Sequence, residues 1–178
     1  MRTAALPLAL LATAAAACSD DPCEGVSGAC TPIEEGASAA TVQAAFINAK
    51  PDSTIAFAAG TYNFNVGLSL DVDGVTLRGA GKDATILSFK AQADGAEGIL
   101  VTADNVTVTQ LAVEDTPGDG LKFLGAGHPT MRDMRVEWTG GPKETNGAYG
   151  LYPVQCTDVT IEDSVVFGAS DAGIYVGQ

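Results

Sequence analysis

Residues 103–123 read ADNVTVTQLAVEDTPGDGLKF, and turn residues divide this stretch into three short apolar segments. The segments are Val106–Val108, Leu111–Val113 and Leu121–Phe123. In each segment the first and third residues are apolar, which is the alternation expected of a strand with one buried face. The stretch therefore predicts a unit of three short strands that share one apolar side.

The unit repeats along the chain. One set of strands is Val75-Thr76-Leu77, Val106-Thr107-Val108, Pro129-Thr130-Met131 and Val159-Thr160-Ile161. A second set begins at Gly98, Gly120, Gly150 and Gly173, with spacings of 22, 30 and 23 residues, and the long interval contains the extra residues 139–146. A unit with one apolar face cannot bury that face alone, whereas stacked units bury it together. The pattern predicts an all-β fold, a parallel β-helix, over residues 38–178. The residues expected to face its core are Val75, Leu77, Val106, Val108, Leu121, Phe123, Ile161 and Ile174.

A leucine-rich repeat has a similar period, but the chain lacks its L-x-x-L-x-L frame and its helical half-repeat. One short helix is expected at residues 38–50, where Val42, Phe46 and Ala49 recur at helical spacing. We expect this helix to cap the first coil. The last coil stops five residues after Gly173, so we expect these residues to belong to a longer protein.

Export is predicted by the first 17 residues, in which Arg2 precedes a short apolar run. The residues before Cys18 resemble a lipoprotein cleavage box, and ordinary cleavage after Ala17 is the alternative. Residues 18–37 are expected to form an acidic tether, in which Cys23 and Cys30 can form a disulfide in an oxidising compartment. These features predict a periplasmic or surface protein, anchored through a lipid on Cys18.

The net charge of −13 disfavours nucleic acid and anionic lipid as partners. We expect a monomer that meets the membrane only through the lipid anchor.

Four stretches carry a family resemblance. They are GVTLRGAGKDATILSF, VEDTPGDGLKF, VEWTGGPKETNGAYGLYPVQC and GASDAGIYVGQ. They are similar to an exported bacterial group within the right-handed parallel β-helix superfamily, which includes pectate lyases, polygalacturonases and mannuronan epimerases. The resemblance covers roughly residues 38–178 and implies a right-handed coil. It does not imply one activity, because this fold carries lyases, hydrolases, epimerases and inert stalks.

The stretch YGLYP resembles part of the epimerase signature, Tyr-Gly-x-Asp-Pro-His followed by an acidic residue. Tyr149, Gly150 and Pro153 match it, whereas Val154 and Gln155 stand where the histidine and the acidic residue are expected. Epimerisation and β-elimination on a uronate need a positioned base and acid. The resemblance thus leaves Tyr149 as the one candidate catalytic residue. If the protein is an enzyme, we expect a polysaccharide lyase or epimerase.

Tyr152 and Tyr175 are expected in one outward column, with Lys122 one coil below Tyr152. A flat aromatic column beside a lysine suits an acidic polysaccharide. The candidate substrate-binding residues are Lys122, Tyr149, Tyr152, Tyr175, Arg135 and Lys143. The alternative is structural, because stacked aromatics stabilise sheets and the cations can pair with nearby carboxylates.

Asp115 and Asp119 flank a Pro-Gly turn and are candidate calcium ligands together with Glu137. Turn chemistry is the alternative interpretation, and no other cofactor is expected. Two functions fit the sequence. The first is an envelope protein that binds, or processes, an acidic polysaccharide. The second is a structural or accessory lipoprotein whose coil is a scaffold.

Overall fold

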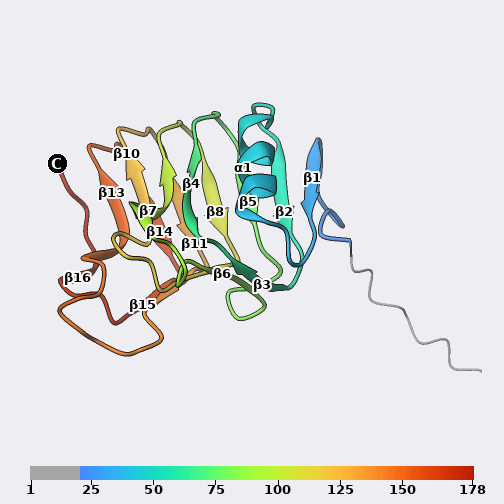
Figure 1. The fold of residues 1–178 in the computed structure, drawn as a ribbon. Coiled ribbons are helices and arrows are strands. Elements are labelled where there is room, and N and C mark those ends of the chain that lie inside the picture. Colours follow the sequence, from blue (N-terminus) through green and yellow to red (C-terminus); the bar gives the residue numbers. More distant parts are fainter. Residues whose placement is uncertain (1–20) are drawn as a thin grey trace, which may run out of the picture.

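The computed structural model describes residues 21–178, so the predicted signal segment and Cys18 lie outside the described residues. Figure 1 shows strands stacked side by side along one axis, with the helix α1 (Ala39–Ile47) near one end. The strands form three parallel sheets. This is an all-β, parallel, solenoid-like fold, as the repeat pattern predicted.

Each of the five coils between β2 and β16 contributes one strand to each sheet, and β1 adds a sixth strand to sheet A. Sheet A has the order β1 (Cys30–Ile33), β2 (Thr54–Phe57), β5 (Thr76–Arg78), β8 (Thr107–Thr109), β11 (Thr130–Arg132) and β14 (Thr160–Glu162). Sheet B consists of β3 (Gly60–Asn63), β6 (Thr85–Ser88), β9 (Ala112–Glu114), β12 (Arg135–Glu137) and β15 (Val165–Phe167). Sheet C consists of β4 (Val66–Leu70), β7 (Asp94–Val101), β10 (Leu121–Leu124), β13 (Tyr149–Val154) and β16 (Ala172–Ile174).

The registers confirm the predicted columns. In sheet A, Thr107 pairs with Thr76 on one side and with Thr130 on the other. In sheet C, Lys122 pairs with Leu100 and with Tyr152. The sequence repeat and the hydrogen-bond register therefore coincide.

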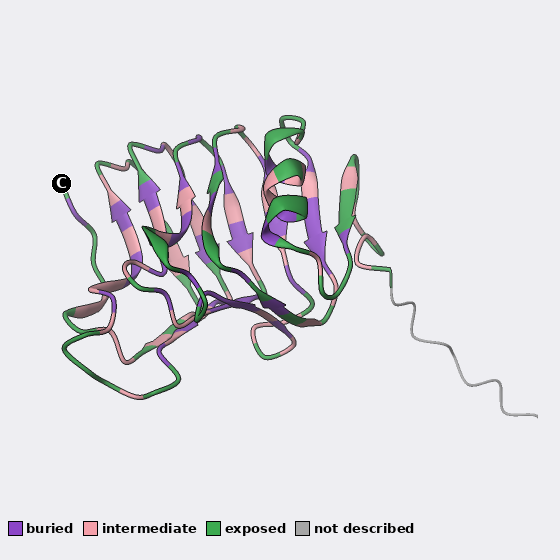
Figure 2. Cartoon of the chain, viewed as in Figure 1, coloured by how far each residue is buried: buried purple, intermediate pink, exposed green. Residues whose placement is uncertain are grey.

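The core fills the space between the three sheets, and Figure 2 shows buried residues alternating with more exposed ones along the strands. Six of the residues predicted to face inward are fully buried: Val75, Leu77, Val106, Val108, Leu121 and Phe123. The prediction was wrong for Ile174, which is 46% exposed, and Ile161 is only partly buried. Both lie in β14 and β16, which are edge strands, so no further strand packs against them.

The glycines that mark the repeat stand where the chain approaches its neighbours closely. A Cβ atom on Gly120 would lie 2.6 Å from the carbonyl oxygen of Gly150 and 2.6 Å from a methyl group of Val136. A Cβ atom on Gly150 would lie 2.3 Å from a methyl group of Val166. Side chains of sheet B thus fill the corner beside sheet C, and only glycine leaves room for them.

Helix α1 covers the first strand of sheet C. The side chain of Ser38 caps the helix by accepting a hydrogen bond from the backbone N–H of Thr41 at 3.2 Å. Val42 and Phe46 are buried in the core. The amide side chain of Gln43 makes two 2.9 Å hydrogen bonds with the backbone of Ser69 in β4. The amide therefore occupies the place that another strand would take at this edge. The helix ends at Ile47, three residues earlier than predicted.

The segment predicted as a tether takes part in the fold. Residues of β1 pair with β2 in sheet A, and Cys30, the first residue of β1, forms a disulfide with Cys23. The guanidinium of Arg78 donates hydrogen bonds to the carbonyl oxygens of Pro22 and Glu24, which fixes the disulfide loop against the sheet. Within residues 21–178, the single helix is far too short to cross a membrane.

Candidate functional site

Three tyrosines pack against one another on the outer side of sheet C. The ring centroids of Tyr149 and Tyr152 are 4.5 Å apart, and those of Tyr149 and Tyr175 are 4.9 Å apart in a stacked arrangement. The rings of Tyr152 and Tyr175 are separated by 5.6 Å. We call Tyr149, Tyr152 and Tyr175 the tyrosine cluster. The structure thus brings together the three tyrosines that the sequence analysis named as candidate substrate-binding residues.

The local backbone explains why Tyr149 joins the other two. In β13, Gly150 and Leu151 are buried, whereas Tyr149 and Tyr152 both remain partly exposed. The chain turns at the glycine corner, so residues three positions apart reach the same outer side. Tyr175 follows β16 and is 45% exposed. The cluster therefore offers ring surface to solvent as well as ring contacts to its own members.

Lys122 lies beside the cluster, with its ammonium nitrogen 5.2 Å from the centre of the Tyr152 ring. The same nitrogen lies 3.0 Å from Oε1 of Glu97 and 3.6 Å from Oδ2 of Asp119. Burial alone lowers the pKa of Lys122, but the hydrogen bond and charge of Glu97, helped by Asp119, raise it overall. Lys122 is therefore charged, and its charge is already matched by carboxylates.

Two further acidic groups adjust the chemistry of the site. Partial burial raises the pKa of Asp119, while Lys122 opposes the shift and Glu97 adds to it. A hydrogen bond to Asp171 raises the pKa of Tyr149. The Tyr149 phenol thus keeps its proton at neutral pH, so it can donate a hydrogen bond but is a poor base.

Sequence reasoning missed Glu97 and Asp171. Glu97 could have been found, because it precedes a repeat glycine, Gly98, as Asp119 and Tyr149 precede theirs. That position forms a second outward column next to the column of Lys122. Asp171 lies in a turn before β16 and has no comparable periodic signal.

Two predicted binding residues lie elsewhere. Arg135 belongs to sheet B, where its guanidinium is 2.8 Å from Glu114 and 3.2 Å from Asp83 and also pairs with Glu137. Its side chain is only 14% exposed. Lys143 lines a hollow that is bordered by the loop of residues 139–146, and none of the three tyrosines lines that hollow.

The three candidate calcium ligands are each engaged separately. Asp115 accepts hydrogen bonds from the N–H and hydroxyl groups of Thr139, at 2.8 and 2.7 Å. Asp119 is paired with Lys122, and Glu137 with Arg135. Within residues 21–178 no three histidine, cysteine or acidic side chains are placed to hold a metal ion.

His128 and Asp158 lie in neighbouring turns, 3.5 Å apart and well exposed. The thiol of Cys156 is partly buried and contacts the carbonyl oxygens of Phe123 and Val154. Among the described residues, neither His128 nor Cys156 forms a hydrogen bond or ion pair with the tyrosine cluster.

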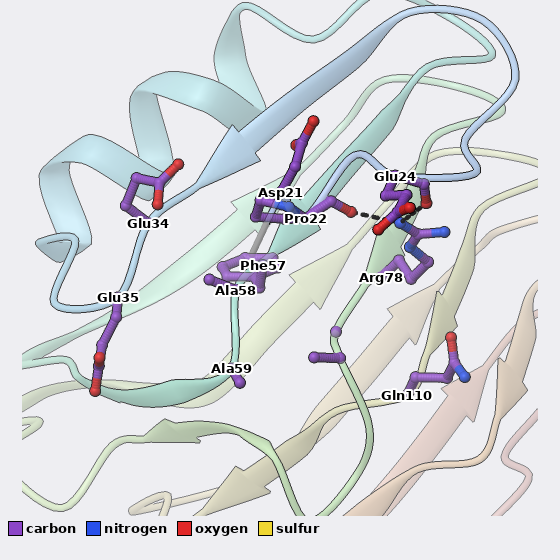
Figure 3. Close-up of a pocket in the computed structure, with 12 residues that line it drawn as sticks. Asp21, Pro22, Glu24, Glu34, Glu35, Phe57, Ala58, Ala59, Arg78 and Gln110 are labelled. Carbon is purple, nitrogen blue, oxygen red and sulfur yellow. Dashed lines mark hydrogen bonds between the residues drawn. The ribbon is translucent and has the colours of Figure 1, made fainter. Parts of the chain in front are cut away.

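A separate cavity of about 650 Å³ lies between the disulfide loop and sheet A. Figure 3 shows Arg78 between Pro22 and Glu24 at one side, and Glu34 and Glu35 on the opposite side. The arginine is committed to the two backbone carbonyl groups described above. The sequence did not predict this cavity, because the segment before residue 38 was expected to lie outside the fold.

No protein-family model, curated protein or solved structure matches the chain.

Proposed function

We propose that this is an exported cell-envelope protein that binds a polysaccharide at the tyrosine cluster. The observation that carries the proposal is the group of three tyrosine rings, with centroids 4.5 to 5.6 Å apart, on an outer face. Aromatic rings cover the apolar faces of sugar rings, and the tyrosine hydroxyl groups remain available for hydrogen bonds. Glu97, Asp119 and Asp171 add acceptors for sugar hydroxyl groups around the rings.

Charge decides which sugar fits best. Lys122, Glu97, Asp119 and Asp171 together carry a formal charge of −2 when ionised. A uronate would have to displace a carboxylate from Lys122, whereas a neutral sugar keeps the ion pairs intact. We therefore expect neutral chains to bind more tightly than the acidic polysaccharide that the sequence suggested, which stays as the competing ligand class.

Binding without turnover is the expected behaviour. Val154 and Gln155 do not transfer protons, and Tyr149 is held in its protonated form by Asp171. If the protein nevertheless processes uronates as a lyase, unsaturated products will appear as new ultraviolet absorbance.

Titration calorimetry with neutral glucan and mannan oligosaccharides, and with oligogalacturonate and alginate fragments, tests the proposal. Tyr152→Ala and Tyr175→Ala should each weaken binding at least about fivefold, since each removes stacking worth roughly 1 kcal/mol or more. Phe167→Ala is the matched control, because Phe167 is a 57% exposed ring on sheet B. Unchanged binding in the tyrosine variants, or no binding by the wild type, refutes the proposal.

The finer architecture belongs to the same proposal: we expect the solenoid to be a right-handed parallel β-helix. Crossovers between parallel strands of one sheet are right-handed in about 98% of cases. The calcium hypothesis from the sequence concerns Asp115, Asp119 and Glu137. An experimental structure determined with calcium in the buffer tests both points.

The second candidate function is a scaffold lipoprotein. It is favoured by the internal pairing of Lys122 and Arg135, which leaves both cations occupied. Incorporation of labelled palmitate into the wild type, and not into Cys18→Ala, would establish the anchor. Absence of label from the wild type would favour ordinary secretion.

A further inference from the structure

A shallow hollow of about 270 Å³ lies at the corner that follows the strands of sheet B. Ser88, Glu114 and Glu137 end three successive strands and are aligned in register. The residues after them continue the ladder, because the N–H groups of Phe89 and Asp115 donate to the carbonyl oxygens of Glu114 and Glu137. The loop of residues 139–146 leaves β12 at this corner and forms one wall of the hollow.

The wall is held in place by its own hydrogen bonds. Asp115 binds Thr139 at the start of the loop, as described above. At its end, the amide of Asn146 donates to the carbonyl oxygens of Gly141 at 2.9 Å and Gly168 at 2.6 Å. The indole N–H of Trp138 donates to the carbonyl oxygen of Thr116 at 2.8 Å. A ligand would therefore meet a preformed surface and would not have to order the loop.

The hollow gathers unpaired positive charge. Among residues 21–178, the cations with carboxylate partners are Lys82, Lys122, Arg132 and Arg135. Lys50, Lys90 and Lys143 have no ion pair in this part of the chain, and Lys90 and Lys143 both line the hollow. The charged residues that line the hollow are Lys90, Lys143 and Asp115, so their formal charges sum to +1, in a chain whose net charge is −13. A positively charged hollow attracts anions, although the negative charge of the remaining surface repels them.

We propose that this lysine hollow, formed around Lys90 and Lys143, binds the oxyanion of an acidic sugar residue. Each ammonium group offers up to three hydrogen-bond donors to carboxylate, sulfate or phosphate oxygens. Thr145 also lines the hollow, and a threonine hydroxyl group can exchange hydrogen bonds with sugar hydroxyl groups. The inference is independent of the tyrosine cluster, because none of the three tyrosines contributes to this surface.

The test is an NMR titration of the isotope-labelled protein with galacturonate, with galactose as the uncharged counterpart and with inorganic phosphate. Galacturonate should shift the amide signals of residues 90, 116 and 139–146 in a saturable manner, and galactose should not. Phosphate binding as tight as that of galacturonate would show that the hollow recognises the oxyanion alone, whereas weaker phosphate binding would show that the sugar ring contributes.

Lys90→Gln and Lys143→Gln should each weaken galacturonate binding about five- to tenfold, and the double variant should abolish it. Both lysines lack ion pairs, so these variants should fold normally. Lys50→Gln is the matched control, because Lys50 is also exposed and unpaired but does not line the hollow. The inference is overturned if the wild type shows no saturable shifts at millimolar galacturonate. It is also overturned if Lys50→Gln weakens binding as much as the hollow variants do, or if the hollow variants bind like the wild type.

Discussion

Arg135 on sheet B and Lys122 on sheet C both point outward and both contact carboxylates, but their surroundings differ. Arg135 is 14% exposed and pairs with Glu114, Glu137 and Asp83. Lys122 is 21% exposed and pairs with Glu97 and Asp119, with the ring of Tyr152 on its other side.

The difference follows from the chemistry of the two cations. A guanidinium has five donors in one plane and can hold carboxylates on neighbouring strands together. Glu114 and Glu137 are such neighbours, since they are paired in register. An ammonium group is a compact charge and tolerates an aromatic ring beside it. Arg135 therefore links the carboxylates of neighbouring strands on sheet B, whereas Lys122 borders a surface that still exposes tyrosine rings.

Replacing Arg135 should have the largest effect on stability. Arg135→Met leaves the carboxylates of Glu114 and Glu137 facing each other across neighbouring strands without a counter-charge. We expect a loss of about 2–3 kcal/mol in the free energy of unfolding at neutral pH, measured by urea denaturation.

Two further variants control this prediction. Arg132→Met removes an exposed pair with Glu162 and should cost less than about 1 kcal/mol. Glu114→Gln in the Arg135→Met background should restore part of the loss. Equal losses of stability in the Arg132 and Arg135 variants would mean that burial of the Arg135 ion pairs contributes nothing to the free energy of unfolding.

The next largest effect is expected at the tyrosine cluster. Tyr152→Ala removes two ring contacts and the contact with Lys122, which should lower the free energy of unfolding by about 1–2 kcal/mol. Tyr152→Phe keeps all three contacts and should change stability by less than about 0.5 kcal/mol. Urea denaturation of both variants checks this. A large loss in the phenylalanine variant would show that the hydroxyl group, and not the ring, stabilises the cluster.

A smaller, pH-dependent effect is expected at Asp119. Burial raises its pKa in the folded state, so the folded protein binds this proton more tightly than the unfolded chain. The contribution of Asp119 to stability therefore falls as the pH rises from the unfolded pKa, near 3.9, through the raised folded pKa. Asp119→Asn does not titrate. The free energy of unfolding of Asp119→Asn, relative to that of the wild type, should therefore increase between about pH 3 and pH 6. This increase should be smaller than the loss expected for Tyr152→Ala. Urea denaturation at several pH values would contradict this if the difference were flat or had the opposite slope.

The smallest effect concerns the acidity of one phenol. Asp171→Asn removes the carboxylate that raises the pKa of Tyr149, so this pKa should fall towards the ordinary value near 10. NMR titration of the tyrosine ring signals measures the shift. Tyr62 serves as an internal reference, because burial, with the charges of Glu34 and Glu35, raises its pKa to about 12 independently of Asp171. An unchanged Tyr149 midpoint would mean that the hydrogen bond to Asp171 does not form.

The columns of the solenoid could be predicted from the sequence because they follow from a repeated pattern that stays recognisable across an insertion. Alternation of apolar residues fixes which side of each triplet is buried, and the spacing of Gly98, Gly120, Gly150 and Gly173 fixes which triplets are neighbours. The register of Lys122 with Tyr152 was therefore predictable before any contact was known.

The partners of the outward residues were less predictable, because they depend on the corners and loops. Tyr149 joins Tyr152 only because the chain turns at Gly150, which strict alternation does not describe. Lys143 was expected beside the tyrosines, but the loop of residues 139–146 lies instead over the ends of sheet B strands. An insertion in a repeat reveals that a loop is present, but it does not determine over which strands that loop folds. That direction is set by hydrogen bonds such as those of Asp115 and Asn146.

The amide of Gln43 has a consequence for how such a chain changes over generations. It ends the hydrogen-bond ladder of sheet C at β4, so no further strand can be added to sheet C at that end. Gene duplication or loss of one repeat further along would lengthen or shorten the outward columns by one residue each. The contacts between α1 and β4 would stay as they are. The outer surfaces formed by these columns can thus be resized by whole units, with the starting end inherited unchanged.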